Sequence, residues 1–503
     1  MKHALITLTA CLLICAQAFA AAAESRSNAN TAGGNPNIIY ILCDDLGYGD
    51  VKCLGGGRSK IATPNIDKLA AGGMIFTEAH SSSAVCTPTR YGILTGRYNW
   101  RRLKAGVLNG YSAPLIAEDR LTVPAFLKQH GYTTACIGKW HLGMDIDPKN
   151  PIAPVGNGPT TRGFDSYFGI SASLDMPPFA FIENDRFTEA PTVEKKFGRK
   201  GAAAPGFEAM DVLPMLARKA SEYIAAKSKE AAPFFLYLPL TSPHTPILPT
   251  KEWQGKSGIS DYGDFVMETD WALGEVLAAL DKAGIADNTL IFFTSDNGCS
   301  PAASVQELEG KGHFPSELRR GYKADIWDGG HRVPFIVRWP AKIKAGSRTD
   351  QITCLTDLMA TSAEIVGAKL PDNAGEDSVS LLPVLLGTAK EPVREAIVHH
   401  SIRGVFAIRQ GQWKLEFCKD SGGWSKGGKV ETDGQLYDMS KDVGERTNEY
   451  AQHPEIVAKL TALLENYVAK GRSTPGARQQ NDVEVVRYSR TEAPKKAKKA
   501  KKQ

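Results

Sequence analysis

The chain of 503 residues is too long for a single small core, so its length favours one large domain with at least one smaller one. Hydrophobic residues make up 42% and charged residues 23%, a globular composition that excludes disorder across the body of the chain. The formal net charge is +5, but it becomes −1 once the six lysines of the final segment APKKAKKAKKQ are set aside. The nearly neutral body gives no case for a nucleic-acid partner.

The first 23 residues predict a secretory signal peptide. They combine a short basic start, an apolar run and small-residue positions such as Ala18 and Ala20. We therefore expect the mature protein to be exported, to the periplasm or beyond the cell. Later apolar stretches are too short to span a bilayer, so the sequence predicts no transmembrane segment.

Cysteine usage argues against both a disulfide scaffold and a zinc site. Two of the nine cysteines lie in the leader, which leaves seven, an odd number, and no C-x-x-C pair occurs. At least one thiol is therefore left over.

Five short apolar runs rich in β-forming residues predict buried strands, at 37–42, 133–138, 233–240, 289–294 and 333–337. Helical patterns lie between them, notably at 212–228 and at 264–284, where Gly284 stands as a C-cap. Strands that alternate with helices predict an α/β domain with a large, mostly parallel central sheet flanked by helices, over residues 35–388.

The chain changes character after about residue 390. Residues 396–418 predict successive short strands joined by a Gly-containing turn, and residues 454–471 predict a closing helix. We expect a smaller α+β subdomain over 389–475, with an antiparallel sheet, followed by a polar, Lys-rich, mobile tail over 476–503.

Polar residues directly follow four of the predicted strands. In open α/β sheets, ligands bind outside the carboxyl ends of the strands, so these residues can converge on one crevice. A first set supplies hard oxygen donors, which suit Ca²⁺ better than Zn²⁺ and are compatible with Mg²⁺: Asp44, Asp45, Asp296 and Asn297. Either pair alone is more often a turn or capping pair, but together they predict a metal site.

A second set supplies cations and proton-transfer groups: Arg90, Lys139, His141, His244 and Lys323. Each alone could be a structural or surface residue. Their shared position with the metal set predicts a site that stabilises negative charge on a transferring group.

Cys86 stands just before a predicted helix start in the segment CTPTR. Pro88 suits a first helical turn, which places the thiol near the positive end of the helix dipole. An isolated cysteine is more often buried and structural. A phosphatase-type thiol nucleophile is disfavoured, because three residues between Cys86 and Arg90 supply too few backbone donors.

The sequence is similar to the formylglycine-dependent sulfatases, an alkaline phosphatase-like fold family. CTPTR matches the family's C-x-P-x-R modification signal, and LTGR matches the stretch after it. Further family blocks occur in the family's order: CDDLGYGD, GKWHLG, SPHTP, SDNG, GYKADIWDGGHRVP and, in the C-terminal subdomain, QWKLEFC with QLYDMSKDVGERTN. The resemblance covers nearly the whole mature chain.

The resemblance implies that a maturation enzyme oxidises Cys86 to formylglycine, whose hydrated aldehyde attacks the sulfur of an O-sulfate ester. It also implies roles for the strand-end residues. The oxygen-donor set would hold Ca²⁺: Asp44, Asp45, Asp296 and Asn297. Arg90 and Lys139 would orient the formylglycine, and His141 would act as the base that releases sulfate. His244 and Lys323 would bind the sulfate ester, and Ser173 and His331 would contact the substrate.

Two departures from the family pattern occur, Thr89 in place of the commoner serine and Asp328 in place of the usual glutamate. The resemblance implies an arylsulfatase-type enzyme that acts on small sulfate esters or sulfated polysaccharides. Two alternatives stay open: a phosphodiesterase or phosphonate monoester hydrolase that uses the same formylglycine, and a non-catalytic binder of sulfated glycans.

Overall fold

The computed structural model describes residues 34–486, so the expected leader at 1–23 and the six tail lysines lie outside the described residues. Its central sheet has ten strands in the order β13-β2-β12-β11-β1-β10-β4-β5-β6-β7. The middle of that sheet is parallel and contains five strands: β11 (Thr289–Ser295), β1 (Asn37–Cys43), β10 (Phe234–Pro239), β4 (Thr133–Lys139) and β5 (Ser166–Ile170). The predicted mostly parallel sheet is confirmed.

The edges of the sheet are built from short strands. On one side lie β12 (Phe335–Arg338), which runs antiparallel to β11, then β2 (Met74–Phe76) and β13 (Ser347–Thr349); on the other lie β6 (Ile182–Glu183) and β7 (Arg186–Phe187). Two small pairs stand apart, β3 (Ala79–His80) with β14 (Thr353–Cys354) and the hairpin of β8 (Val193–Phe197) and β9 (Arg199–Ala203).

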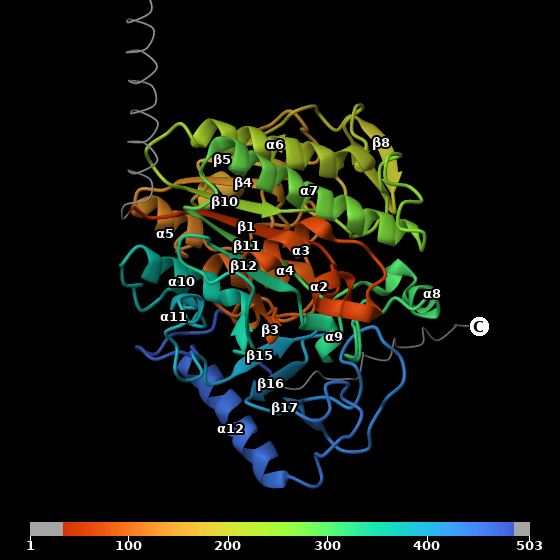
Figure 1. Cartoon of the computed structure of the whole chain (residues 1–503), viewed down its shortest axis with the longest axis vertical. Helices are drawn as coiled ribbons and strands as arrows, with labels where there is room; N and C mark the ends of the chain where they lie inside the picture. The colour runs from red at the N-terminus through yellow and green to blue at the C-terminus, as the bar shows by residue number, and fades with distance from the viewer. Residues whose placement is uncertain (1–33, 487–503) are drawn as a thin grey trace, which may run out of the picture.

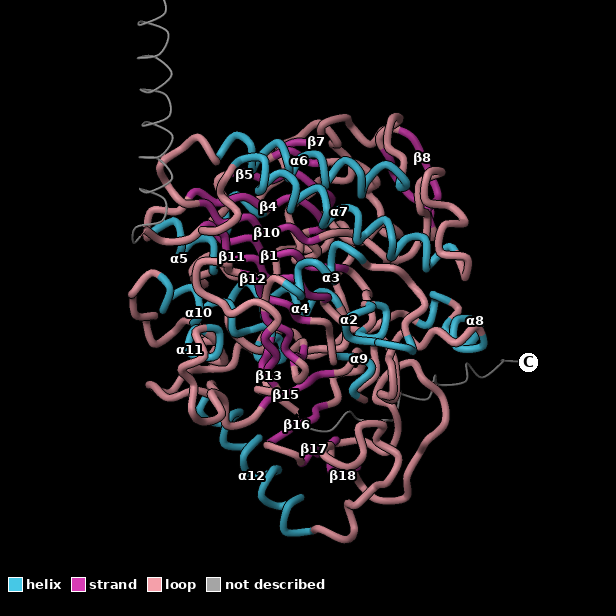
Figure 2. Tube along the Cα trace, viewed as in Figure 1, coloured by secondary structure: helices cyan, strands magenta, loops and turns pink. Residues whose placement is uncertain are grey.

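Helices cover both faces of the sheet (Figures 1 and 2). Alternate residues of β1 enter different cores, Ile39 and Ile41 on one face and Ile38 and Tyr40 on the other, as a strand period of two dictates. The first core is shared with α3 (Pro64–Ala71), α6 (Val212–Lys227) and α7 (Asp261–Ala283), and the second with α4 (Cys86–Thr95), α5 (Val123–Gln129) and α10 (Leu358–Ile365). Short helices complete the domain: α2 (Lys52–Gly55), α8 (Val305–Gly310), α9 (Asp328–His331) and α11 (Leu382–Leu385).

Helix α7 shows why the sequence signals were readable. Ser260 accepts a hydrogen bond from the backbone N–H of Gly263 at the start, and Gly284 takes the left-handed conformation, φ 68°, at the end. The predicted C-cap at Gly284 is confirmed.

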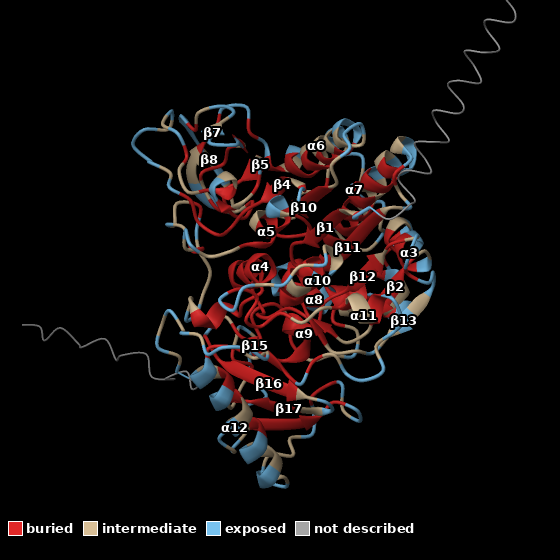
Figure 3. Ribbon diagram, turned by 90° about the vertical axis from the view of Figure 1, so that its left-hand side faces the viewer, coloured by how far each residue is buried: buried red, intermediate tan, exposed pale blue. Residues whose placement is uncertain are grey.

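The smaller subdomain is an antiparallel meander of β15 (Ile397–His400), β16 (Phe406–Gln410), β17 (Trp413–Glu416) and β18 (Gln435–Asp438). Helix α12 (Pro454–Lys470) packs on it through Leu460, Leu464 and Tyr467 and exposes its opposite face (Figure 3). The predicted strands and closing helix are present, and β18 adds a strand that the sequence did not predict.

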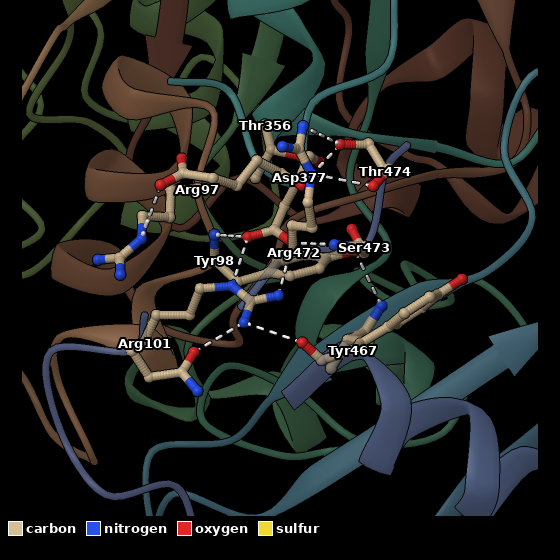
Figure 4. A network of polar contacts seen from close by, with 12 residues as sticks. Arg97, Tyr98, Arg101, Thr356, Asp377, Tyr467, Arg472, Ser473 and Thr474 are labelled. Carbon is tan, nitrogen blue, oxygen red and sulfur yellow. Dashed lines mark hydrogen bonds and ion pairs between the residues drawn. The ribbon is translucent and has the colours of Figure 1, made fainter. Parts of the chain in front are cut away.

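Buried charges fasten this subdomain to the larger one (Figure 4). Asp377 accepts hydrogen bonds from the backbone of Tyr98 and from Arg101 at 2.8 Å, and Arg101 also donates to the carbonyl of Tyr467 in α12 at 3.1 Å. Because all these groups are buried, loss of one partner would leave an unpaired charge inside the protein.

The first part of the expected tail at 476–503 contacts the large domain. The buried Arg97 donates to Asp482 at 3.0 Å, and Arg101 donates to Asn481 at 2.8 Å. Two buried guanidinium groups thus have residues 480–482 as partners, and the mobility of the tail stays a prediction. The seven cysteines among the described residues are all free. No helix in the described part of the chain is long and apolar enough to cross a membrane.

Candidate active site

Four strands of the parallel sheet deliver the predicted residues to one edge. β1 ends at Cys43, just before Asp44 and Asp45; β11 ends at Ser295, before Asp296. Cys43 pairs with Ser295 in register, which brings the two acidic segments level with each other. β4 and β10 end on the other side of β1 and supply Lys139, His141 and His244. The convergence that the sequence predicted is confirmed for these residues.

Lysines from distant segments neutralise the first two aspartates. Lys139 donates to Asp44 at 2.7 Å, and Lys323 donates to Oδ2 of Asp45 at 2.9 Å. Burial by itself raises the pKa of Asp44, but Lys139, His244 and Arg90 outweigh that effect and hold the pKa well below its usual value. Asp44 is therefore ionised at neutral pH.

Arg90 forms a buried ion pair with the third aspartate, Asp296. Its Nε and Nη2 donate to one oxygen of Asp296 at 3.0 and 2.7 Å, and its Nη1 donates to the carbonyl of Lys139 at 3.0 Å. Burial and the charge of Asp44 raise the pKa of Asp296 to about 6. A nearby dication would lower the pKa of Asp296 again, since it favours the ionised carboxylate.

The donor set fits a hard cation. Oδ1 of Asp44 and Oδ1 of Asn297 are buried and have no hydrogen-bond partner, although buried acceptors are normally satisfied. Nδ2 of Asn297 donates to Asp45 at 2.7 Å, which fixes the amide orientation. One ligand atom each of Asp44, Asp45 and His244 lies within 4.8 Å of the others. Carboxylate and amide oxygens of this kind are ligands for Ca²⁺ or Mg²⁺.

Cys86 is the first residue of α4 and is 2% exposed. Burial raises the pKa of its thiol, while the positive charges of Lys139 and Lys323 act in the opposite direction. The thiol thus lies within the electrostatic reach of the site's lysines and aspartates, yet it stays protonated at neutral pH. A buried, protonated thiol is a poor nucleophile.

His141 has a defined tautomer. Its Nε2 lies 2.8 Å from the carbonyl oxygen of Leu108, which can only accept, so Nε2 carries the proton. Nδ1 is buried without a partner and therefore presents a free lone pair. Burial, aided by Lys139, lowers the pKa of His141 well below its usual value, so the ring is a neutral proton acceptor.

His244 and Lys323 mark the mouth of the site, because at 6% exposed each they are its least buried predicted residues. The Nδ1–H of His244 donates to the carbonyl of Thr245 at 2.5 Å, and Nε2 lies 3.7 Å from Asp45. Burial and the charge of Lys323 lower the pKa of His244. A substrate that enters here meets an ammonium group and a neutral imidazole.

The backbone is strained where it enters the site. Asp45, His141 and Ala324 adopt positive φ angles of 69°, 57° and 81°, a region that non-glycine residues rarely occupy. Such strain costs of order 1–3 kcal/mol per residue and is concentrated at functional sites in proteins.

Two predicted residues differ in their placement. Ser173 follows β5, and its hydroxyl is buried without a hydrogen-bond partner, so it remains a candidate. His331 is not brought to the site. Its ring contacts His80 and the carbonyl of Ile326, and the charges that act on it are those of Lys414 and Asp328. The ring is directed toward His399 of the C-terminal sheet, so none of its described contacts supports the expected role at the substrate.

Thr87 is a positioning residue that the sequence reasoning missed. Its hydroxyl donates to the carbonyl of His141 at 3.0 Å and accepts from the backbone N–H of Leu108 at 3.2 Å. It thus joins the helix of Cys86 to both the base and the base's partner. It lies at an unspecified position of C-x-P-x-R, so no signal in the sequence could have identified it.

Two family models match the chain. The model described as Sulfatase matches residues 36–368, and the model described as N-sulphoglucosamine sulphohydrolase, C-terminal, matches residues 322–470.

Several curated proteins are similar over most of the chain. The N-acetylgalactosamine-6-O-sulfatase of Bacteroides thetaiotaomicron is 36% identical over 86% of this chain and 93% of its own length. Human arylsulfatase A is 33% identical over 82% of this chain and 83% of its own length. Human steryl-sulfatase is 31% identical over 75% and 74%.

Solved structures show the same architecture. A 6S-sulfatase structure from work on the metabolism of multiple glycosaminoglycans by Bacteroides thetaiotaomicron has a TM-score of 0.78 and 33% identity, and it covers 86% of this chain and 99% of that one. Ps i-CgsB, solved with k-i-k-neocarrahexaose, has a TM-score of 0.70 and 25% identity over 89% and 95%.

Proposed function

Because the chain belongs to the sulfatase family, whose named members hydrolyse sulfate esters, we propose that its strand-end site is the sulfatase active centre and that Cys86 is its nucleophile precursor. The observation that carries the proposal is the position of Cys86. The residue begins a buried helix within the field of Lys139, Lys323, Asp44 and Asp296. A protonated thiol there serves poorly as a nucleophile, whereas its oxidised form, formylglycine, would supply an aldehyde hydrate with two hydroxyl groups.

The residues of the site divide the work by charge. Lys323 and His244 lie at the mouth, where they would bind the sulfate group, and the ammonium of Lys323 would donate a proton to the departing oxygen. His141 offers the unprotonated Nδ1 as the base that assists sulfate release. Arg90 and Lys139 hold the carboxylates in place through buried ion pairs.

A calcium ion would be held by Asp44, Asp45, Asp296 and Asn297, and its ligands would include Oδ1 of Asp44 and Oδ1 of Asn297, which have no hydrogen-bond partner. When bound, it would supply positive charge that polarises a sulfate oxygen. The three carboxylates are balanced by Arg90, Lys139 and Lys323, so a dication would make the site positive overall and suited to an anionic ester.

The substrate we propose is an O-sulfated sugar, with small aryl sulfates as surrogate substrates. The relatives that support this assignment are the N-acetylgalactosamine-6-O-sulfatase and the structure solved with an oligosaccharide. Arylsulfatase A supports the aryl activity that the sequence suggested. The signal-peptide-like start of the sequence supports export, where extracellular glycans are accessible.

The direct test is mass spectrometry of the Cys86 peptide from protein made in its native host or together with a formylglycine-generating enzyme. We expect an aldehyde in place of the thiol. Turnover of N-acetylgalactosamine-6-sulfate and nitrophenyl sulfate should exceed that of nitrophenyl phosphonate. Faster phosphonate cleavage would indicate the phosphonate hydrolase instead. An unmodified thiol in protein that binds sulfated glycans without turnover would indicate a non-catalytic binder.

A further inference from the structure

Three buried histidines form a second cluster, separate from the strand-end site. His80 ends β3, His331 ends α9 and His399 lies in β15. All three side chains are 0% exposed, and one ring nitrogen of each lies within 4.8 Å of the other two. The cluster therefore joins three segments that are far apart in the sequence, two from the large domain and one from the C-terminal sheet.

Two of the rings turn one nitrogen toward an outer carbonyl, and the third lies near a carboxylate beyond hydrogen-bond distance. Nε2 of His331 lies 3.0 Å from the carbonyl of Ile326, and Nδ1 of His399 lies 3.3 Å from the carbonyl of Ser81. Nε2 of His80 lies 3.8 Å from a carboxylate oxygen of Glu78. Carbonyl and carboxylate groups of this kind fix the tautomer of metal-binding histidines.

The other nitrogens face one another. Nδ1 of His80 and Nδ1 of His331 are 3.1 Å apart and share a hydrogen bond, so one of them carries the proton, and Nε2 of His399 is buried without a hydrogen-bond partner. A metal ion would take the place of the shared proton, since imidazole binds metals through an unprotonated ring nitrogen.

The surrounding charges also favour a cation. Four carboxylates line the network against three cations: Glu78, Asp328, Glu416 and Glu445 against Arg332, Arg409 and Lys414. A bound cation would offset the excess of carboxylates over cations in this buried region.

We propose that His80, His331 and His399 bind a divalent transition metal ion, with Zn²⁺ as the preferred ion, at a structural site distinct from the oxygen-lined catalytic one. Three imidazoles suit Zn²⁺ and its neighbours rather than Ca²⁺. The rings of His331 and His399 are stacked, with centroids 3.7 Å apart and an angle of 13° between their planes. Because a ring nitrogen binds a metal in the plane of its ring, one of the two rings would rotate out of the stack when the ion binds.

The metal site would hold the C-terminal sheet against residues 83–86, the segment that leads into Cys86. The residue after His399, His400, accepts hydrogen bonds at its carbonyl from the backbone of Ala84 at 3.0 Å and from the hydroxyl of Ser83 at 2.8 Å. Cys86 lies two residues after Ala84. A metal ion at the cluster would therefore hold the segment that leads into Cys86 against β15.

The test is the metal content of the whole protein, produced with Zn²⁺ and purified in excess Ca²⁺ so that the oxygen site is filled. We expect a single equivalent of Zn²⁺ by mass spectrometry. In the variants His80→Gln and His399→Gln, the zinc content should fall by about ten-fold or more. The matched control is His400→Gln, since this neighbouring buried histidine contacts Asn99 instead of the cluster, and it should keep its zinc.

A second measurement needs no variant. Protein produced with Co²⁺ in place of Zn²⁺ should show the visible absorption bands of a nitrogen-ligated cobalt ion. Absence of both zinc and these bands in the wild-type protein would overturn the proposal, and so would equal zinc in His399→Gln that folds by circular dichroism.

Discussion

At the scale of single residues, protonation states decide the chemistry of the candidate site. Cys86 is held as a thiol by burial, and His141 is held as a neutral base by the carbonyl of Leu108 and by the desolvation of its ring. Both effects come from the same absence of water. A site closed to solvent strengthens each remaining charge, so that Lys139 and Lys323 act on an anionic group more strongly than surface lysines would.

Replacement of Cys86 should separate activity from stability. In Cys86→Ala we expect sulfatase turnover to fall to background, while the melting temperature stays close to that of the wild type, since the side chain is small and makes no ion pair. Initial rates on nitrophenyl sulfate and a thermal scan check both expectations. Activity retained in the variant would mean that another residue is the nucleophile.

Loss of the base should affect the rate more than binding. For His141→Ala we expect kcat to fall by about 10²–10⁴-fold, the usual contribution of a positioned general base, with a smaller change in KM. The control is His130→Ala, because that half-buried ring contacts only the end of α5, and its kinetics should match the wild type. Equal kcat values for His141→Ala and the wild type would contradict the assigned role.

Removal of the metal should weaken both activity and stability. Dialysis against a chelator leaves three buried carboxylates without their dication, so we expect activity to be lost and to return with Ca²⁺ better than with Mg²⁺. At a calcium concentration about 100 times the Kd, binding stabilises the fold by about 2.7 kcal/mol, which thermal scans with and without Ca²⁺ would detect. Full activity after exhaustive chelation would argue against the metal.

At the scale of elements, helix ends are capped from distant parts of the chain. The N-cap of α3, Thr63, makes no side-chain capping bond. Asp270 of α7 replaces it: its carboxylate accepts from the backbone N–H groups of Asn65 at 3.1 Å and Ile66 at 2.8 Å. A carboxylate at a helix N-terminus also interacts favourably with the positive end of the helix dipole, so this contact orients α3 on α7.

The variant Asp270→Ala should therefore destabilise the protein by about 1–2 kcal/mol, as loss of a helix cap does. Asp281→Ala is the matched control, because Asp281 lies on the same helix in an exposed ion pair with Lys68 at 3.8 Å and should have little effect. Urea unfolding of both variants gives the comparison. Equal free energies of unfolding would show that α3 does not depend on the cap.

At the scale of the whole molecule, buried neutral histidines make stability depend on pH. Burial lowers the pKa of His400 from 6.5 to about 4. Between those values the unfolded chain takes up a proton that the folded chain excludes, so stability is present above pH 6.5 and is lost as the pH falls. The full effect of this one group is up to about 3 kcal/mol.

We therefore expect the melting temperature to fall as the pH is lowered from 7 to 4.5, and to fall less steeply in His400→Gln, which lacks the group. Thermal scans of both proteins across this range give the two slopes. Parallel slopes would show that His400 does not stay neutral in the folded protein.

Much of the fold and the site followed from local patterns. The strand-end residues were predictable because parallel strands place their carboxyl ends at one edge, so residues after β1, β4, β10 and β11 had to meet. Helix α7 was predictable because its caps lie in its own sequence. By contrast, Thr87 and the two-residue edge strands carried no local signal, since their roles depend on partners elsewhere in the chain.

The sequence by itself determined the α/β architecture, the acidic and cationic sets and the singular position of Cys86, because periodicity and motif spacing are local properties. Only the tertiary structure decided where the long-range partners lie. It placed His331 against His80 and His399, and it placed residues 480–482 in contact with Arg97 and Arg101. The physical reason is that a buried polar group must find a partner in space, and the chain offers that partner hundreds of residues away.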